Sequence, residues 1–551
     1  MPVRSQMSRF APWDRNRPGA FLQKAALKPV FLSAAANADT GSQQPSAPST
    51  SGRRLRAWRW SLLLALTGFP VQAAHAQATL QEKPSAAVVF EKVCDRVRQS
   101  YQGLEPAACR ELPIGLFDSG TGGLTVLEQI LGLDAFDNAT HAPRAGGDGR
   151  PDFEWEQFVF LADQANMPYG HYASVGKAEF LRELVLKDAE FLMLAEQRAA
   201  NRCPLAPGEG PSEPAKAVVI ACNTATAHGE HLIRKLIRDA GAPVFLLGVI
   251  EAGAEGALES LPEGQGGTIG VLATCGTVSA GAYPATIQRL AQARHPRAAV
   301  QVVQQGSLGL AGAIDGVADF IAPTAKGVRS GYRGPGFDNT EAPIARECLP
   351  RMAFDFSGGA MLCQGDPGNP TALQINSVAN YVAYDVTLLL ESVRRAAPAE
   401  PLRAVILGCT HFPYFADAFR HQLRRLYDYQ EEGRYVYRPW MAEHVAVIDP
   451  AQFAAKQLYR ALARDRRLSP PRALNRARGE FFITVPNRAW PGAALSEGGW
   501  FTHDYKYGRV PGLDGADVRR VPLTPRWLEP SAWERLRREV PRTFALLERS
   551  P

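Results

Sequence analysis

The chain has 551 residues, which exceeds one ordinary hydrophobic core and predicts two domains with additional segments. Hydrophobic residues make up 46% and charged residues 21%, so most of the chain is expected to fold. The net charge of +6 is a weak hint of anionic partners, but we find no basic motif interleaved with aromatic residues and expect no binding to nucleic acid.

Residues 1–76 have the composition of a leader. Residues 34–52 (AAANADTGSQQPSAPSTSG) are too polar to pack, and residues 53–76 run from a basic stretch through a short apolar core to Ala74-His75-Ala76. That order is typical of a secretory signal, and its core is too short to span a membrane. We expect a periplasmic or exported protein if this signal is used and a cytoplasmic one otherwise, with an unstructured leader as the alternative. A linker is predicted at 77–110.

Eight cysteines do not decide the compartment. Cys94 lies near Cys109 in the sequence, and Cys348 lies near Cys363. In an oxidising compartment either pair could close a small loop, and otherwise the four thiols are free.

After the linker, apolar strand-like runs alternate with helical spacing. The runs are IGLFDSGTGGLTVLEQI (114–130), FVFLAD (158–163), KAVVIACNTATAHG (216–229), PVFLLGVIEAG (243–253), TIGVLATCGTVSAGAYPATIQRL (268–290) and RAVILGCTHFPYF (403–415). Alternation of this kind predicts an α/β fold with parallel sheets. Ligands bind such sheets at the carboxyl ends of the strands, where the polar clusters of these runs fall.

Two kinds of run each occur twice. IGLFDSGTGG pairs with IGVLATCGTV, and VVIACNTATA pairs with AVILGCTHFP. A duplicated unit is the simplest account, so we predict two similar doubly wound parallel-sheet domains related by pseudo-twofold symmetry, with the active site in the cleft between them. The predicted boundaries are 111–245 plus 411–465 for the first domain, 246–410 for the second with an inserted loop region at 320–372, and 466–551 for a C-terminal extension.

Cys222 and Cys409 hold matching positions in the second kind of run, each where a strand gives way to a helix start. Two thiols on opposite sides of one carbon can invert it, because one takes a proton while the other returns one. Each sulfur would then lie about 3–3.5 Å from the carbon, and the two sulfurs roughly 6–7 Å apart. Backbone N–H groups and the helix dipole favour the thiolate at such a position.

Polar neighbours of these cysteines are candidates for supporting roles. Asp118 and Ser119 follow the first strand and could orient an amino group or donate to a carboxylate, although a turn-forming Asp is the ordinary alternative. His411 follows Cys409 and could relay protons. Asn223, Thr224 and Thr410 can donate to a substrate carboxylate. We find no zinc-type spacing and no Walker lysine, so no metal is predicted and phosphate binding is not favoured.

At these motifs the chain resembles glutamate racemase, within the cofactor-independent aspartate/glutamate racemase superfamily. The resemblance is carried by IGLFDSGTGGLTVL, ADQANMPYG, ACNTATA, GVIEAG, IGVLATCGTVSAGAY and LGCTHFPY, in pieces from about 112 to 450. The histidine after the second cysteine is more like glutamate than aspartate racemases.

The resemblance implies two α/β domains with Cys222 and Cys409 as the acid/base pair, assisted by Asp118 and His411, and no pyridoxal phosphate or other cofactor. It further implies interconversion of L- and D-glutamate for peptidoglycan, with a homodimer as one assembly left open. The implied substrate-binding residues are Asp118, Ser119, Tyr169, Gly170, Asn223, Thr224, Thr410 and His411.

The chain also departs from this family. The family usually has a Glu-Gly pair before the second cysteine, for which Asp315 in AGAIDGV is the nearest candidate, and a late IDS segment here reads VIDPAQ (447–452). Two alternatives therefore stay open. One is a relative on this fold that acts on aspartate or another small carboxylate, and the other is an exported binding protein without catalysis.

Overall fold

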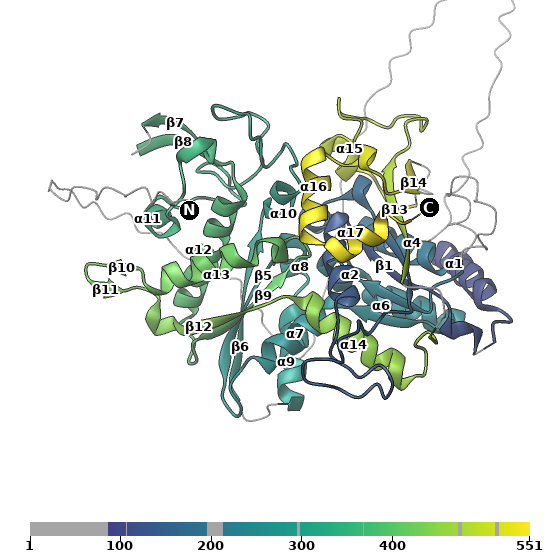
Figure 1. The fold of residues 1–551 in the computed structure, drawn as a ribbon. Helices are drawn as coiled ribbons and strands as arrows, with labels where there is room; N and C mark the ends of the chain where they lie inside the picture. The colour runs from purple at the N-terminus through teal and green to yellow at the C-terminus, as the bar shows by residue number, and fades with distance from the viewer. Residues whose placement is uncertain are drawn as a thin grey trace, which may run out of the picture. The chain divides into compact units, whose positions relative to one another are not determined.

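A computed structural model describes residues 86–105, 107–194, 213–294, 298–366, 369–471, 477–512 and 517–550. The predicted leader, with its secretory signal at 53–76, lies outside these residues. The described chain contains two mainly parallel sheets with helices packed around them, and two short hairpins (Figure 1). We call the first sheet with its helices the first lobe, and the second sheet with its helices the second lobe.

The first sheet has six strands in the order β14-β13-β2-β1-β3-β4. Its neighbours are parallel except for β13 and β14, so β14 forms an antiparallel edge. The strands β1, β2 and β3 are almost wholly buried, because helices cover both faces. The bounds are β1 (Ile114–Asp118), β2 (Gln157–Ala162), β3 (Ala217–Ile220), β4 (Phe245–Gly248), β13 (Arg478–Pro486) and β14 (Val518–Pro522).

The second sheet has four parallel strands in the order β12-β9-β5-β6. Its strands are β5 (Gly267–Thr274), β6 (Val300–Ser307), β9 (Leu402–Gly408) and β12 (Met441–Ile448). The two hairpins are formed by β7 (Met361–Asp366) with β8 (Asn369–Ile375), and by β10 (Gln430–Glu431) with β11 (Arg434–Tyr435).

The two sheets share one strand order. The order β2-β1-β3-β4 in the first lobe matches β6-β5-β9-β12 in the second. The register matches as well, since Phe117 pairs with Ile220 two residues before Cys222, and Leu272 pairs with Leu407 two residues before Cys409. The predicted α/β class with parallel sheets is confirmed, and the repeat seen in the sequence corresponds to a repeat in topology.

Each lobe has an apolar core on both faces of its sheet. In the first lobe α2, α14, α16 and α17 contribute to one core and α1, α4 and α6 to the other. In the second lobe α12 and α13 contribute to one core and α7 and α9 to the other. The helices are α1 (Ala86–Tyr101), α2 (Leu124–Leu131), α3 (Gly170–Ser174), α4 (Ala178–Met193), α6 (Asn223–Ala240), α7 (Val249–Glu259), α8 (Cys275–Ser279), α9 (Ala282–Arg294), α10 (Leu310–Ile314), α11 (Leu349–Met352), α12 (Val378–Ala396), α13 (Ala416–Tyr427), α14 (Pro450–Arg464), α15 (His503–Gly508), α16 (Pro530–Glu539) and α17 (Pro541–Leu547).

The chain returns to the first lobe later than predicted. The predicted boundaries placed 411–465 in the first domain, but α13 packs on α12, and β12 pairs with β9 in the second sheet. Within 411–465, only α14 joins the first lobe, where it packs against α2, while it also contacts α7 of the second lobe. The boundary is corrected to the segment after β12, because the pattern of a single strand does not reveal which sheet it joins.

The predicted C-terminal extension (466–551) is part of the first lobe rather than an appendage. Its strand β13 lies between β2 and β14. The sequence RGEFFITVP is buried along most of its length, so it lacks the polar and apolar alternation by which strands are recognised. The predicted linker (77–110) is corrected too, because α1 packs on α4 and α6.

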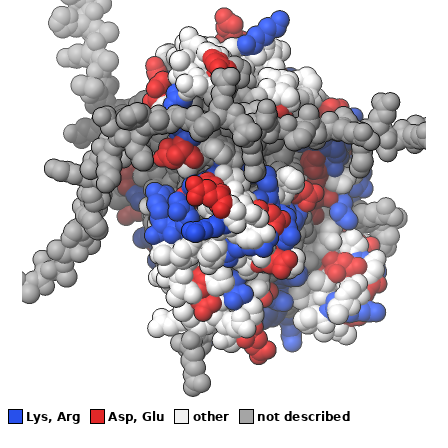
Figure 2. All heavy atoms as spheres, turned by 90° about the vertical axis from the view of Figure 1, so that its left-hand side faces the viewer, with Lys and Arg blue, Asp and Glu red and all other residues white. Residues whose placement is uncertain are grey.

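The inserted loop region (320–372) contains α11 and the β7–β8 hairpin, and α11 packs against α12. The four cysteines considered for disulfides, Cys94, Cys109, Cys348 and Cys363, are free thiols. Acidic and basic side chains are interspersed on the face shown in Figure 2. In the described part of the chain, no helix combines the length and apolarity needed to cross a bilayer.

The packing of β13 predicts that the extension contributes to global stability. Ile483 is fully buried in the core of the first lobe, so Ile483→Ala is expected to lower the free energy of unfolding by about 2–5 kcal/mol. Chemical denaturation would measure the change, with the exposed Arg519→Ala on β14 as control. Equal stability of the two variants would contradict the integration of the extension.

Candidate active site

The predicted catalytic residues lie at the carboxyl ends of three strands, β1 and β3 of the first sheet and β9 of the second. Asp118 is the last residue of β1, and Cys222 follows β3 and caps the first turn of α6. Cys409 follows β9, and His411 precedes a 3₁₀ turn at Phe412–Phe415. All four side chains are buried.

A hydrogen bond joins the two lobes at this point. The Thr410 hydroxyl of the second lobe donates to Asp118 Oδ2 of the first lobe at 3.1 Å. The Gly123 N–H donates to the same oxygen at 2.7 Å, and the Thr125 hydroxyl lies 3.3 Å from the Thr410 carbonyl. The glycine-rich turn after β1 therefore holds both the Asp118 carboxylate and the segment that follows Cys409.

Close approach of the lobes explains one glycine of this turn. A Cβ atom at Gly122 would lie 2.6 Å from His411 Cε1 and 2.7 Å from Thr410 Oγ1, closer than van der Waals contact allows. Only a residue without a side chain lets the turn pack against His411.

Cys222 lies in an environment that favours its neutral thiol. The Ala225 N–H donates to Cys222 Sγ at 3.5 Å, and the thiol lies 3.8 Å from Ser119 Oγ. Burial raises the pKa of Cys222 well above its usual value, and the Asp118 carboxylate raises it further, against the smaller effect of the two hydrogen bonds. Cys409 makes a smaller contribution to raising this pKa.

Cys409 lies beside a basic ring, whereas Cys222 lies near a carboxylate. Its Sγ lies 3.7 Å from Nδ1 of His411, and Nε2 of that ring lies 3.2 Å from Asp315 Oδ2. Burial by itself lowers the pKa of His411, but Asp315 outweighs burial, so the pKa lies well above its usual value. This shift favours the charged imidazolium, and the ring lies directly beside the Cys409 sulfur.

One oxygen of Asp118 is available for a ligand. Oδ2 accepts from Gly123 and Thr410, whereas the buried Oδ1 has no hydrogen-bond partner among the described residues. Burial raises the pKa of Asp118, and the nearby His411 charge opposes that rise. A buried acceptor without a partner is costly, so this oxygen marks a position for a bound donor.

Three other predicted residues lie around Cys222. Ser119 is within contact of its sulfur, and the Tyr283 hydroxyl donates to Asn223 Oδ1 at 2.6 Å, which leaves the Asn223 amide nitrogen as the group that can donate to a ligand. The Thr224 hydroxyl forms 2.9 Å hydrogen bonds with Thr274 and with Thr277 across the lobes. The hydroxyl of Thr224 thus ties the lobes together.

Tyr169 and Gly170 have structural partners. The Tyr169 hydroxyl is in hydrogen-bond contact with Asp188 Oδ2 at 2.6 Å and with Asp163 Oδ2, so it is engaged by two carboxyl groups. A Cβ at Gly170 would lie 2.7 Å from Thr274 Cβ, which shows that this segment packs closely on the second lobe. Substrate contact by Tyr169 and Gly170 stays a prediction, one that the Tyr169 hydroxyl does not support.

Two residues of the site were underestimated or missed. Asp315 was only a loose candidate in the sequence, yet it is the carboxylate that contacts His411. Arg535 of α16 was not predicted at all, and it contacts Asp315 at 2.8 Å. The basic sequence of α16, PSAWERLRRE, is typical of a solvated helix and carries no signal of this contact.

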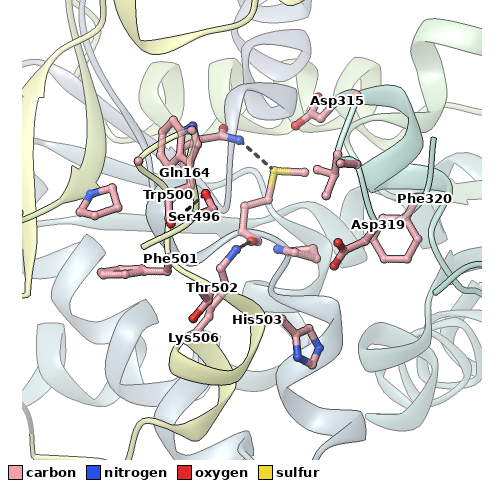
Figure 3. Close-up of a pocket in the computed structure, with 18 of the residues that line it drawn as sticks. Gln164, Asp315, Asp319, Phe320, Ser496, Trp500, Phe501, Thr502, His503 and Lys506 are labelled. Atoms are coloured by element: carbon pink, nitrogen blue, oxygen red, sulfur yellow. Dashed lines mark hydrogen bonds between the residues drawn. The ribbon is translucent and has the colours of Figure 1, made fainter. Parts of the chain in front are cut away.

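A cavity of about 1320 Å³ adjoins the site (Figure 3). Thr121 and Asp315 form part of its wall beside the catalytic residues. Much of the remaining wall comes from the extension, including Trp500, Phe501 and Lys506. In the residues that the structure describes, no group of three or more His, Cys, Asp or Glu side chains is arranged to hold a metal ion.

Comparison with known proteins agrees with the motifs. The chain is 33% identical over 214 residues to the glutamate racemase of Limosilactobacillus fermentum, covering 38% of this chain and 62% of that protein. It is 27% identical over 388 residues to the glutamate racemase of Symbiobacterium thermophilum, covering 69% of this chain and 91% of that protein. The chain is similar to glutamate racemases. The resemblance predicted from the motifs is thereby confirmed.

The first of these glutamate racemases is matched over less than two thirds of its length, and no protein-family model matches the chain. Among solved structures, glutamate racemase isoform RacE1 from Bacillus anthracis aligns with a TM-score of 0.38 at 20% identity, covering 68% of this chain and 89% of that chain. Glutamate racemase from Francisella tularensis in complex with D-glutamate aligns with a TM-score of 0.34 at 19% identity, covering 68% and 88%.

The raised pKa of Cys222 predicts a distinctive titration. A thiol with a raised pKa forms its thiolate only at higher pH, so the alkylation rate of Cys222 by iodoacetamide should keep rising above about pH 9, where thiols of the unfolded chain have levelled off. Peptide mass mapping would follow Cys222 in the folded protein and in denaturant. Asp118→Asn removes a charge that raises the pKa, so it should move the rise to lower pH. A titration of folded Cys222 that matches the denatured chain would contradict this environment.

Proposed function

We propose that the chain is an amino-acid racemase that interconverts L- and D-glutamate through Cys222 and Cys409. The main support is positional: the two cysteines follow equivalent strands of the repeated lobes, and Asp118 and Thr410 link their surroundings in one buried network. Similarity to glutamate racemases supports glutamate as the substrate.

The proposed reaction consists of two proton transfers. The Cys409 thiolate removes the α-proton from one face of glutamate, which leaves a carbanion at the α-carbon. The Cys222 thiol then delivers its proton to the opposite face, so the centre inverts and the two cysteines exchange protonation states. The mirror-image reaction begins from that exchanged state, and no oxidant or reductant is required.

The two cysteines are assigned different starting roles. Cys222 has a raised pKa and is assigned the role of proton donor, and Cys409, whose sulfur lies 3.7 Å from Nδ1 of His411, is assigned the role of base. Equal and opposite starting states are what a two-base inversion needs, because two thiols could not remove the proton and two thiolates could not replace it.

Substrate binding is proposed to use groups left free by the network. Asp118 Oδ1 would accept from the α-ammonium group. The Asn223 amide, the Ser119 hydroxyl and the first N–H groups of α6 would donate to carboxylate oxygens. The mechanism uses only these side chains and backbone groups, without a cofactor.

The product D-glutamate would supply peptidoglycan, and through it cell-wall biogenesis and cell shape. Export through the signal at 53–76 and assembly as a homodimer stay predictions. Activity on aspartate or another small carboxylate, and binding without catalysis, are the outcomes that the following experiment distinguishes.

Racemisation in D₂O tests the proposal. Incubation of L-glutamate with the enzyme should place deuterium on the α-carbon of both enantiomers, as read by mass spectrometry after chiral separation. Cys222→Ser and Cys409→Ser should each lower the rate by about 10²–10⁴-fold, because an alcohol is a much weaker acid and its anion is not formed at neutral pH.

Cys363→Ser, on the β7 strand, serves as the matched control and should keep full activity. Deuterium exchange at the α-carbon of aspartate but not of glutamate would make aspartate the substrate in place of glutamate. Absence of label with every amino acid would overturn the catalytic proposal in favour of a binding protein.

A further inference from the structure

One arginine of the C-terminal extension contacts the buried residues of the candidate active site. Arg535 lies on α16, and its Nη2 donates to Asp315 Oδ1 at 2.8 Å. Its other terminal nitrogen donates to the Ile314 carbonyl, the last residue of α10. The guanidinium is thus hydrogen-bonded to two consecutive residues at the end of α10. The Arg535 side chain is 13% exposed.

Asp315 divides its two oxygens between two cations. Oδ1 accepts from Arg535, while Oδ2 faces Nε2 of His411 at 3.2 Å. Since a carboxylate is planar, fixing one oxygen by a guanidinium that is itself anchored fixes the direction of the other. In Figure 3, Asp315 lies at the edge of the cavity, on the segment that leads to Asp319 and Phe320.

Acidic and basic side chains alternate along a line from the first lobe to α16, in the order Asp118, His411, Asp315 and Arg535. The side chains of the first three are at most 6% exposed, and Asp315 contacts both of its basic neighbours. Burial alone would raise the pKa of Asp315, but His411 and Arg535 together lower it below its usual value. The Tyr414 ring packs against the guanidinium of Arg535, with 5.5 Å between the ring centroid and Arg535 Cζ.

We propose that Arg535 is a positioning residue of the racemase site. It holds Asp315 so that this carboxylate keeps the His411 imidazolium beside Cys409, although Arg535 itself touches neither cysteine nor substrate. The inference rests on the proposed function for its catalytic consequence, and it gives the C-terminal extension a role at the site.

The same helix provides a matched control. Arg538 is three residues from Arg535, its side chain is 74% exposed, and its ion partner Glu539 is its neighbour in the chain. Leu536 and Ala532 bury the inner side of α16, so the helix has apolar anchors that do not depend on Arg535. Removal of either arginine side chain is therefore expected to leave the helix docked.

Steady-state kinetics on the full chain would test the coupling. We expect Arg535→Ala to lower kcat for glutamate about tenfold or more with KM little changed, because misplacement of a supporting group affects the transition state more than binding. The kcat of Arg538→Ala should equal that of the parent enzyme. Arg535→Lys keeps the charge but loses the planar guanidinium with its paired N–H donors, so its kcat should lie between those of Arg535→Ala and the parent enzyme.

A double-mutant cycle separates positioning from general stabilisation. If Arg535 acts through Asp315, adding Arg535→Ala to Asp315→Asn should change kcat by less than about twofold. A full additive loss in that background, or unchanged kcat in Arg535→Ala, would overturn the inference. Parent enzyme without racemase activity would instead overturn the proposed function.

An NMR titration of the His411 ring provides a readout that needs no substrate. Arg535→Ala should shift the pKa of His411 by about half a unit or more, because Asp315 loses its fixed orientation, whereas Arg538→Ala should leave it in place. An unchanged His411 titration in Arg535→Ala would overturn the inference whatever the activity of the parent enzyme. Arg535→Lys serves the same measurement if the alanine variant does not fold.

Discussion

The hydrogen bond from Thr410 to Asp118 is the contact on which the proposed site depends. It joins the carboxyl end of β1 in one lobe to the segment after β9 in the other, at a place where both partners are buried. A hydrogen bond to a buried charged group contributes about 1.5–3 kcal/mol, and loss of one partner strands the other. Gly122 allows this contact, because a side chain there would collide with Thr410 and His411. The duplicated α/β unit thus brings its two loop regions into contact at the proposed site.

Charge distribution gives the two cysteines different environments within a similar framework. Cys222 lies near the Asp118 carboxylate, which disfavours its anion, whereas Cys409 lies beside the basic ring of His411, 3.7 Å from Nδ1. Asp315 and Arg535 extend the second arrangement outward. The repeat therefore supplies symmetry of position, and the unrepeated residues around it supply asymmetry of charge.

How much of this was predictable depends on whether the signal is local. The strand-to-turn segments that contain Cys222 and Cys409 are short and contiguous, so the fold class, the repeat and the equivalent positions of the two cysteines followed from pattern alone. The sheet joined by β12, the buried strand β13 and the contact between Arg535 and Asp315 depend on residues far apart in the chain. One partner of the Tyr169 hydroxyl, Asp188, was hidden for the same reason, since it lies on α4, 19 residues further along the chain. Long-range packing rather than local propensity decides these features.

The central claim is that Cys222 and Cys409 flank one stereocentre. A crystal structure of the full chain with bound glutamate tests it most directly. The account predicts the α-carbon between the two sulfur atoms, each about 3–3.5 Å away on opposite faces, with the ammonium group on Asp118. Glutamate bound with both sulfurs on one face, or in a place remote from either cysteine, would contradict the account.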